Sequence, residues 1–380
     1  MSKKLFIDCV DIVGSSCKPF DGTKKYISTG SVSVDHIDEK NIEIITYTDK
    51  PSRADLIVEP GTLLFAKMQG TKKTLYIDVE KSKNVYSTGF YALKAKKGII
   101  NDRCLYHLLE SESFLMQKDK NCSGATQKAI TNAGLKKICV CLPDYHCQET
   151  VAEQLDKISS IISSHQQQLQ KLDELVKSRF IELFGDPVSN PKKFDKRSLK
   201  DTCKVVTGNT PSRAVEEYYG DFVEWIKTDN IVSGMLNPTR AAEFLSEEGM
   251  KVGRLVEKNA ILMACIAGSI ASIGRVCVTD RTVAFNQQIN AIVPKDYNPL
   301  FLYVLLQISK DYLIEDVSMA LKGILSKSKL EEKEFIVPSI ELQEQFADFV
   351  AEVDKSKLAV QQGLEKLETL KKSLMQQYFG

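Results

Sequence analysis

The sequence predicts a mixed α/β (α+β) protein in which two globular domains are joined by two long antiparallel coiled-coil helices, related by a pseudo-two-fold internal repeat. Two observations lead to this fold. The segment that ends at Phe184 and Gly185 recurs 195 positions later and ends at Phe379 and Gly380. Both copies space their apolar residues in alternating steps of three and four, which is typical of a coiled-coil seam.

The repeat extends over the domains as well as the helices. The same offset of 195 pairs Pro143 with Pro338 and Gln148 with Gln343. Further upstream the offset drifts by a few residues, as expected when loops differ in length over a shared scaffold. The residues matched there are Leu105, Tyr106, Leu108 and Leu109 with Leu302, Tyr303, Leu305 and Leu306.

The repeat divides the chain into four segments. We expect the first globular domain at residues 1–142, the first long helix at 143–185, the second domain at 186–337 and the second long helix at 338–380. Residues 186–200 begin with Asp, Pro and Asn residues that favour irregular structure, and they predict a linker into the second domain.

Each long helix has a start signal and a stop signal. Asp144 and Ser339 follow the two matched prolines as expected N-caps, and a glycine follows each last turn. About 40 residues at ~1.5 Å each would give a rod of about 60 Å, which separates domains. Packing of each helix on its own domain is the alternative. The predicted seam consists of Val151, Leu155, Ile158, Ile162, Leu169, Leu172, Val176, Leu183, Phe346, Val350, Val353, Val360, Leu364, Leu367 and Leu374.

Antiparallel packing of equivalent helices would have a geometric consequence. The operation that relates them is a pseudo-two-fold axis, which carries the two domains to opposite ends in opposite orientations. A DNA duplex bound by both domains would meet them with inverted polarity, as two half-sites. Because the two domain sequences differ, the half-sites should differ as well.

Within each domain, short apolar runs predict strands and one longer run predicts a helix. The first domain has expected strands at Leu56–Val58, Thr62–Ala66, Thr74–Val79 and Ile138–Leu142, with a helix at Leu105–Met116. The second has expected strands at Ala260–Ala264, Arg275–Val278 and Glu334–Val337, with a helix at Pro299–Ile308.

The composition is that of a soluble globular protein, with 43% hydrophobic and 27% charged residues. The net charge of +1 conceals an uneven distribution, since residues 1–142 carry +6 and residues 186–337 carry 0. Any nucleic-acid contact would therefore lie on particular surfaces. No run predicts a signal peptide or a membrane span, and the ten scattered cysteines favour reduced thiols. We therefore expect a cytoplasmic protein.

The chain resembles the specificity subunit of type I restriction-modification enzymes over essentially its whole length. The resemblance rests on the order domain, helix, domain, helix and on two end patterns. The domain-end pattern is Gly124, Thr126, Gln127, Leu135 and Pro143, with the weaker copy Gly323, Leu330 and Pro338. The helix-end pattern is Leu183, Phe184, Gly185, Asp186 and Pro187.

The resemblance implies that each globular domain is a target-recognition domain. Together they would read a bipartite, asymmetric sequence in double-stranded DNA, while the helices set the gap and dock two methyltransferase subunits. Restriction subunits would join that complex. The chain itself would be non-catalytic and bind no cofactor, because the partner subunits would bind S-adenosylmethionine and ATP.

Loops that differ between the two copies are the candidate DNA contacts. Lysine side chains suit phosphates or guanine, and Asn or Gln amides can pair bidentately with adenine. Ordinary solvated lysines and loop hydrogen bonds remain the alternative. The candidates are Ser15, Ser16, Thr71, Lys72, Lys73, Ser87, Thr88, Thr126, Gln127, Lys128, Asn209, Thr210, Ser269, Asn286, Gln287, Gln288 and Lys322.

Other functions are disfavoured by the residues. Cys139, Cys141, His146 and Cys147 could resemble a zinc site, but the repeat places Ile336 and Leu342 at two of these positions, so we predict no metal. A self-sufficient methyltransferase or nuclease would need motifs that we do not find. A scaffolding coiled-coil protein with protein-binding globular ends is the main alternative to DNA recognition.

Overall fold

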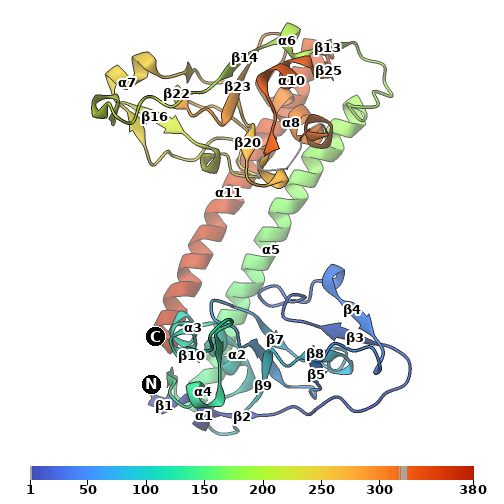
Figure 1. Ribbon diagram of the computed structural model, residues 1–380, viewed down its shortest axis with the longest axis vertical. Helices are drawn as coiled ribbons and strands as arrows, with labels where there is room; N and C mark the ends of the chain where they lie inside the picture. Colours follow the sequence, from blue (N-terminus) through green and yellow to red (C-terminus); the bar gives the residue numbers. More distant parts are fainter. Residues whose placement is uncertain (1, 316, 318–322) are drawn as a thin grey trace. The chain divides into compact units, whose positions relative to one another are not determined.

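The computed structural model describes residues 2–315, 317 and 323–380. Its contacts form two compact units: unit 1 comprises Met1–His165 and Gly363–Gly380, and unit 2 comprises Gln166–Gln362. We call residues 2–142 of unit 1 head 1, and residues 186–337 of unit 2 head 2. Figure 1 shows the two long helices, α5 (Tyr145–Phe184) and α11 (Ile340–Phe379). Each of them is divided between the two units.

Head 1 contains two four-stranded sheets. The main sheet is antiparallel in the order β2-β9-β6-β7, and the second has the order β4-β3-β8-β5 with β3 and β8 parallel. The main-sheet strands are β2 (Val10–Ile12), β9 (Phe90–Ala95), β6 (Leu63–Ala66) and β7 (Thr74–Tyr76). Those of the second sheet are β4 (Glu43–Ile45), β3 (Lys24–Ile27), β8 (Val85–Ser87) and β5 (Ala54–Leu56).

Head 2 repeats this arrangement. Its main antiparallel sheet has the order β14-β23-β19-β21, and its second sheet has the order β15-β17-β16-β22-β18 with β16 and β22 parallel. The main-sheet strands are β14 (Cys203–Thr207), β23 (Ile289–Pro294), β19 (Ile261–Ala264) and β21 (Val276–Val278). Those of the second are β15 (Tyr219–Gly220), β17 (Phe244–Leu245), β16 (Val223–Ile226), β22 (Val283–Phe285) and β18 (Leu255–Val256).

Small two-stranded sheets complete each head. In head 1, β1 (Ser2–Leu5) pairs with β12 (Cys139–Leu142), and β10 (Cys122–Ser123) pairs with β11 (Ala129–Ile130). In head 2, β13 (Lys196–Ser198) pairs with β25 (Glu334–Ile336), and β20 (Ile266–Ala267) pairs with β24 (Gly323–Ile324). The predicted linker 186–200 is therefore too long, since its last residues enter β13 and α6 (Leu199–Thr202).

The helices of the heads differ from the expectation in one respect. The expected single helix at Leu105–Met116 is two helices, α2 (Asp102–Glu110) and α3 (Glu112–Lys120). Ser111 separates them because its extended backbone ends α2, while its side chain accepts from the Phe114 amide and caps α3. In head 2, α8 (Pro299–Ile308) has the predicted bounds and is followed by α9 (Lys310–Ile314).

The remaining short helices are α1 (Phe6–Cys9), α4 (Asn132–Leu135), α7 (Glu247–Val252) and α10 (Lys327–Glu332). One expected strand is displaced: β5 ends at Leu56, whereas the prediction began there. Ile57 instead forms an isolated bridge with Ser15. No helix among residues 2–315, 317 and 323–380 is long and apolar enough to cross a membrane.

The two long-helix segments run antiparallel within each unit. In unit 1, the Tyr378 hydroxyl donates to Gln154 Oε1 at 3.3 Å, and the ring of His165 lies against Gly363. In unit 2, Lys357 Nζ lies 2.6 Å from Asp173 Oδ1, and the rings of Phe184 and Phe346 are 5.5 Å apart. Residue numbers on one helix rise as those on the other fall, which confirms the predicted antiparallel pairing within each unit.

Apart from Leu364, the buried residues of the predicted seam lie in the N-terminal half of each long helix. Val151, Leu155, Ile158, Phe346, Val350, Val353 and Leu364 are buried, while Ile162, Leu169, Leu172, Val176, Leu183, Val360, Leu367 and Leu374 are partly buried. Near the C-terminal end of each long helix, the residues packed into the cores of the heads are Phe180, Phe184, Met375 and Phe379. The stripe shifts there because an α-helix drifts by about 20° per heptad, so each end turns toward its head.

A buried glutamine joins each long helix to the head before it. Gln148 Oε1 accepts from the Asn101 amide at 3.0 Å, and its Nε2 donates to the carbonyls of Ile99 and Pro143. Gln343 makes the same three bonds in unit 2, to the Asn298 amide at 2.9 Å and to the carbonyls of Asp296 and Pro338. The internal repeat therefore preserves a joint as well as a fold.

Candidate nucleic-acid interface

The topology gathers the candidate loops at one end of each main sheet. In head 1, β2 and β6 end where β9 and β7 begin, because neighbouring strands are antiparallel: Ile12 pairs with Leu93, and Ala66 with Phe90. In head 2, Thr207 pairs with Asn290, and Ala264 with Ile289. In head 1, the loops that follow β2 and β6 therefore lie at the same end of the main sheet as the loop that precedes β9. In head 2, the loops that follow β14 and β19 lie at the same end of the main sheet as the loop that precedes β23.

Head 1 brings three candidate groups together around loop 67–73, which connects β6 to β7. The Gln69 amide donates to the Lys128 carbonyl at 2.9 Å, so this loop lies beside Thr126, Gln127 and Lys128. All three are exposed. Lys72 is exposed as well, whereas Lys73 donates through Nζ to the Thr29 carbonyl at 2.6 Å. Thr71 is partly buried and donates to the Met68 carbonyl.

Lys67 links this loop to the third candidate group, Ser87 and Thr88. Its amide donates to the Gly89 carbonyl at 2.9 Å, and its Nζ donates to the Thr88 carbonyl at 2.8 Å and lies 4.4 Å from the centre of the Tyr91 ring. Burial lowers the pKa of Lys67. Thr88 is exposed, but Ser87 is buried and accepts from the Gly89 amide, so Thr88 is the side chain of this pair that faces solvent.

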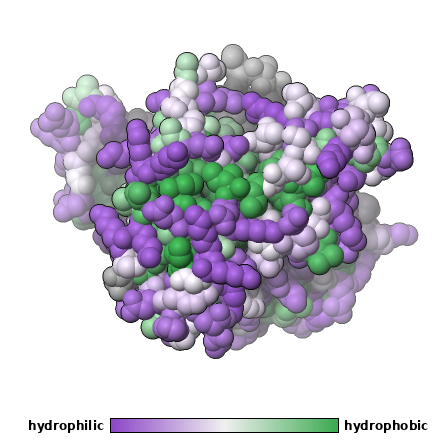
Figure 2. All heavy atoms as spheres, turned by 90° about the horizontal axis from the view of Figure 1, so that it is seen from below, coloured by the Kyte–Doolittle hydropathy of each residue, from purple (hydrophilic) through white to green (hydrophobic). Residues whose placement is uncertain are grey.

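Ser15 and Ser16 lie apart from these contacts. The Ser15 amide donates to the Ile57 carbonyl at 3.0 Å, and the Ser16 hydroxyl bonds to Asp55. Between β2 and loop 67–73 lies a shallow hollow of about 580 Å³, lined by Ile12, Val13, Leu56, Lys67, Phe90, Tyr91, Ala92, Ile130, Thr131, Asn132 and Ala133. The face of unit 1 shown in Figure 2 carries a band of hydrophobic atoms bordered by hydrophilic ones.

Head 2 packs two candidate loops directly on each other. The Gly208 amide donates to the Ile289 carbonyl at 3.0 Å, and a Cβ built at Gly208 would lie 2.1 Å from the Asn286 carbonyl oxygen. Only glycine permits this approach. The Thr210 hydroxyl then donates to Gln287 Oε1. The side chain of Asn209 is used internally, because it bonds to the Val252 carbonyl and the Arg254 amide.

The amides at 286–288 differ in availability. Asn286 is 5% exposed, its Oδ1 accepts from the Gln288 amide at 3.1 Å, and its Nδ2 donates to Gln288 Oε1 at 3.3 Å. Gln287 is exposed. Gln287 is the most exposed of the three, but its Oε1 accepts from the Thr210 hydroxyl, so base readout by Gln287 would use its Nε2.

Ser269, a further candidate of head 2, lies on the connection between β19 and β21. The Gln288 carbonyl accepts from the amides of Cys265 and Ile266, which brings the 286–288 turn beside the start of this connection. Ser269 is exposed and its hydroxyl lies 3.0 Å from that of Ser272. Lys322 lies outside the described residues. Every candidate contact in both heads thus remains a prediction, with its position now known except for Lys322.

Sequence reasoning missed a cationic cluster around Trp225. Trp225 is 3% exposed. The Arg213 guanidinium lies 5.1 Å and Lys227 Nζ 5.1 Å from the centre of its ring, and both cations bond to Glu243. These hydrogen bonds lower the Glu243 pKa. No spacing signal predicts the cluster, because Arg213 and Glu243 come from segments separate from the one that carries Trp225 and Lys227.

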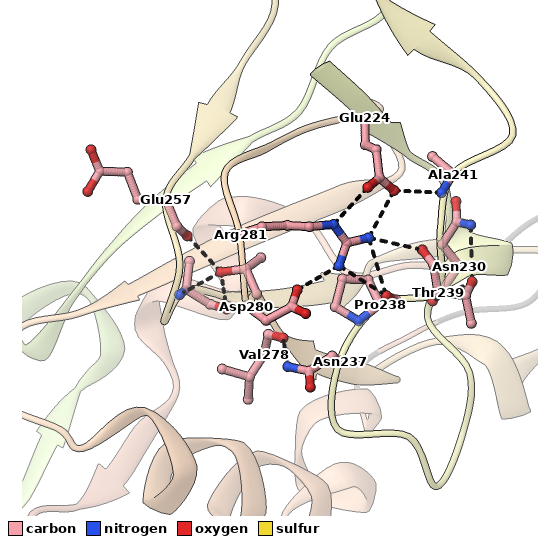
Figure 3. A network of polar contacts seen from close by, with 12 residues as sticks. Glu224, Asn230, Asn237, Pro238, Thr239, Ala241, Glu257, Val278, Asp280 and Arg281 are labelled. Carbon is pink, nitrogen blue, oxygen red and sulfur yellow. Dashed lines mark hydrogen bonds and ion pairs between the residues drawn. The ribbon is translucent and has the colours of Figure 1, made fainter. Parts of the chain in front are cut away.

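A second polar network holds the connection between β16 and β17 (Figure 3). Arg281 donates through Nε and Nη2 to Glu224 at 2.8 and 2.9 Å, and through Nη1 to Asp280 at 2.6 Å. Glu224 Oε2 also accepts from the Ala241 amide at 2.7 Å. The Arg281 hydrogen bond is the largest cause of the lowered pKa of Glu224, and it outweighs the opposite effect of burial. Bidentate pairing of this kind fixes geometry as well as charge.

The three cysteines of the possible zinc site do not gather around a metal position. Cys139 and Cys141 lie in β12 opposite Leu5 and Lys3, and Cys147 is exposed on α5. Across the part of the chain that the structure describes, no three His, Cys, Asp or Glu side chains are grouped to hold a metal ion.

Two heads of one topology, each with polar loops gathered at one edge of its main sheet, define a duplicated recognition module. Residues 8–174 and 191–371 both match the family described as the type I restriction modification DNA specificity domain, and the chain belongs to that family. The specificity subunit of the type I restriction enzyme HindI from Haemophilus influenzae is 22% identical over 399 residues, covering 83% of this chain and 85% of that protein.

Two further likenesses agree. The MjaIX specificity subunit from Methanocaldococcus jannaschii is 29% identical over 170 residues, which cover 43% of this chain and 38% of that protein. The crystal structure of the type I restriction-modification S subunit from M. genitalium has a TM-score of 0.58 at 15% identity, covering 100% of this chain and 96% of that one. At such low identity the second likeness concerns the fold alone.

Proposed function

We propose that each head reads one block of a bipartite, asymmetric sequence in double-stranded DNA, and that the two blocks differ. DNA sequence specificity in type I restriction-modification is the function of the family to which the chain belongs. One observation supports a bipartite target. Each head has polar loops at the same end of its main sheet, and the loops of the two heads carry different side chains. Head 1 presents Lys72 and Lys128, whereas head 2 presents Gln287 and Thr210.

We further propose that the chain works within a complex and performs no chemistry itself. Two methyltransferase subunits and the restriction subunits would be its partners, and they would bind S-adenosylmethionine and ATP. One solved relative, with a TM-score of 0.55 at 16% identity over 99% of this chain and 97% of that one, is described in terms of complex assembly of a type I system. The helix surfaces of α5 and α11 outside the seam are the expected docking surfaces.

The test is a methylome of cells that express the chain with and without its cognate methyltransferase subunit. We expect methylated adenines in a motif of two short specified blocks, separated by a fixed unspecified gap, only when both proteins are present. A continuous or palindromic motif would contradict the proposal. The purified chain alone should neither bind S-adenosylmethionine nor cleave DNA, and either activity would instead favour a self-sufficient enzyme.

A further inference from the structure

A buried lysine of α3 donates hydrogen bonds to the backbone of loop 67–73 in head 1. Lys118 is 1% exposed, and its Nζ donates to the carbonyls of Met68 at 3.0 Å and Thr71 at 2.6 Å. Its remaining polar neighbour is Asp119 Oδ1 at 3.4 Å. A buried ammonium is retained only where acceptors replace its lost water. Here the two hydrogen-bond acceptors are carbonyls of a single loop, and Asp119 adds an ion pair.

The same helix fixes the loop at further points. The side-chain amide of Gln69 donates to the Asp119 carbonyl at 3.3 Å. Gly70 has a φ of +70°, which allows the chain to turn between the two carbonyls that face Lys118. The turn therefore has one defined conformation, and the exposed side chain of Lys72 projects from it.

Head 2 has a partly exposed lysine that makes a similar contact from an unmatched position. Lys310, the first residue of α9, donates through Nζ to the Ala271 carbonyl at 2.6 Å, in the connection between β19 and β21. Burial lowers its pKa. Ser111 and Ser309 mark the same point in the two heads, directly before α3 and α9. Counted from there, Lys118 and Lys310 do not correspond, so the repeat did not copy one lysine from the other.

We infer that Lys118 and Lys310 are positioning residues for sequence readout, each serving only its own head. The inference rests on the proposed function, in which the loop after β6 or β19 reads DNA. Without the ammonium, the Met68 and Thr71 carbonyls lose their shared donor, and loop 67–73 no longer holds one conformation. The side chains it carries then meet the duplex in several arrangements, which weakens discrimination in one block of the target and leaves the other intact.

The experiment compares methylomes of the complete complex carrying the wild-type chain, Lys118→Met or Lys310→Met. The measured quantity is the ratio of methylation at target sites to methylation at sites with one substituted base pair, taken separately for each block. We expect Lys118→Met to lower this ratio about tenfold in one block, comparable with losing discrimination at one base pair. Lys310→Met should do the same in the other block.

Two more variants separate positioning from general stability. Lys120→Met removes an exposed lysine of the same helix and should change neither ratio. Gly70→Ala disturbs the loop while Lys118 stays in place, because a Cβ there meets open space but the positive φ becomes strained. It should reproduce the block-specific loss, and it decides the question if Lys118→Met does not fold.

The outcomes distinguish the inference from the proposed function. A continuous wild-type motif would overturn the proposed function, and the inference with it. A bipartite wild-type motif with no block-specific effect of Lys118→Met or Gly70→Ala would overturn the inference alone. Equal relaxation of both blocks by Lys118→Met would also overturn it, because a loss of overall stability acts on both heads.

Discussion

Replacing Gln343 by leucine should separate the contribution of the head-to-helix joint from that of the seam. Gln343 is 1% exposed and joins the start of α11 to the segment that leads into α8. Leucine has a similar volume and is a good helix former, so the substitution leaves the helix and its packing largely intact. What it removes is the set of three hydrogen bonds made by the side-chain amide.

The magnitude follows from the groups left behind. The Asn298 amide loses its acceptor at 2.9 Å and the Pro338 carbonyl loses a donor at 2.9 Å, whereas the bond to Asp296 is weaker at 3.4 Å. An unsatisfied buried group costs about 1–3 kcal/mol, so the net loss should be about 2–4 kcal/mol. In a domain of 150–250 residues this lowers Tm by roughly 4–16 °C.

The assay is differential scanning calorimetry of the full chain, supported by urea unfolding at 25 °C. Gln345→Leu is the matched control, because Gln345 is exposed on the same helix two residues later and should change Tm little. Gln148→Leu is an internal replicate that should destabilise unit 1 by a similar amount. A fall in Tm of under about 2 °C for Gln343→Leu, or an equal fall for the control, would refute the reasoning.

The remaining predictions concern the polar network of head 2 and the long helices. Arg281→Met should lower the free energy of unfolding by about 1–3 kcal/mol in urea titrations, because it leaves the largely buried Glu224 carboxylate unpaired; an unchanged midpoint would contradict this. Since Arg281 lowers the Glu224 pKa from its ordinary 4.5, the pair stabilises above that pH, and the contribution is lost as pH falls through the lowered value. Glu224→Gln should therefore flatten the acid limb of stability against pH. Inserting seven residues near Ser163 and again near Leu358 should lengthen the unspecified gap in the methylated motif by roughly three base pairs, from a helix extension of about 10 Å. An unchanged gap would reject the spacer role of the helices.

The sequence predicted those parts of the fold that depend on periodicity and duplication. Steps of three and four residues between matched Pro and Gly residues predicted α5 and α11 to within two residues of their observed ends. The break at Ser111 was missed because the apolar spacing continues through it, and only the side-chain cap shows that the helix restarts. Periodicity reports which face is buried, whereas a cap is a local competition for backbone amides.

The candidate interface was predictable only in outline. Differences between the two copies identified loops that lie at the same end of the main sheet in each head, since the order of the main-sheet strands is common to both heads. They did not predict how far each side chain is used internally: Asn286 and Asn209 bond through both polar side-chain atoms, whereas Gln287 is exposed and accepts from Thr210 through Oε1. Nor did they single out Lys118, because a lysine in a helix ordinarily faces water and only the tertiary structure shows the carbonyls it meets.

The internal repeat preserves the contacts that join each head to its long helix. It does not preserve the lysine contacts that support the loops. Gln148 and Gln343 correspond through the repeat and make the same bonds, so the joint has been kept in both copies. Lys118 and Lys310 do not correspond, although both hold the loop that follows a matched strand. A joint must fit an equivalent helix in either copy, whereas under the proposed function a loop must fit its own block of DNA. The position of the supporting lysine on the helix therefore differs together with the loop that it contacts. We regard each loop and its lysine as one structural unit that differs between the two heads.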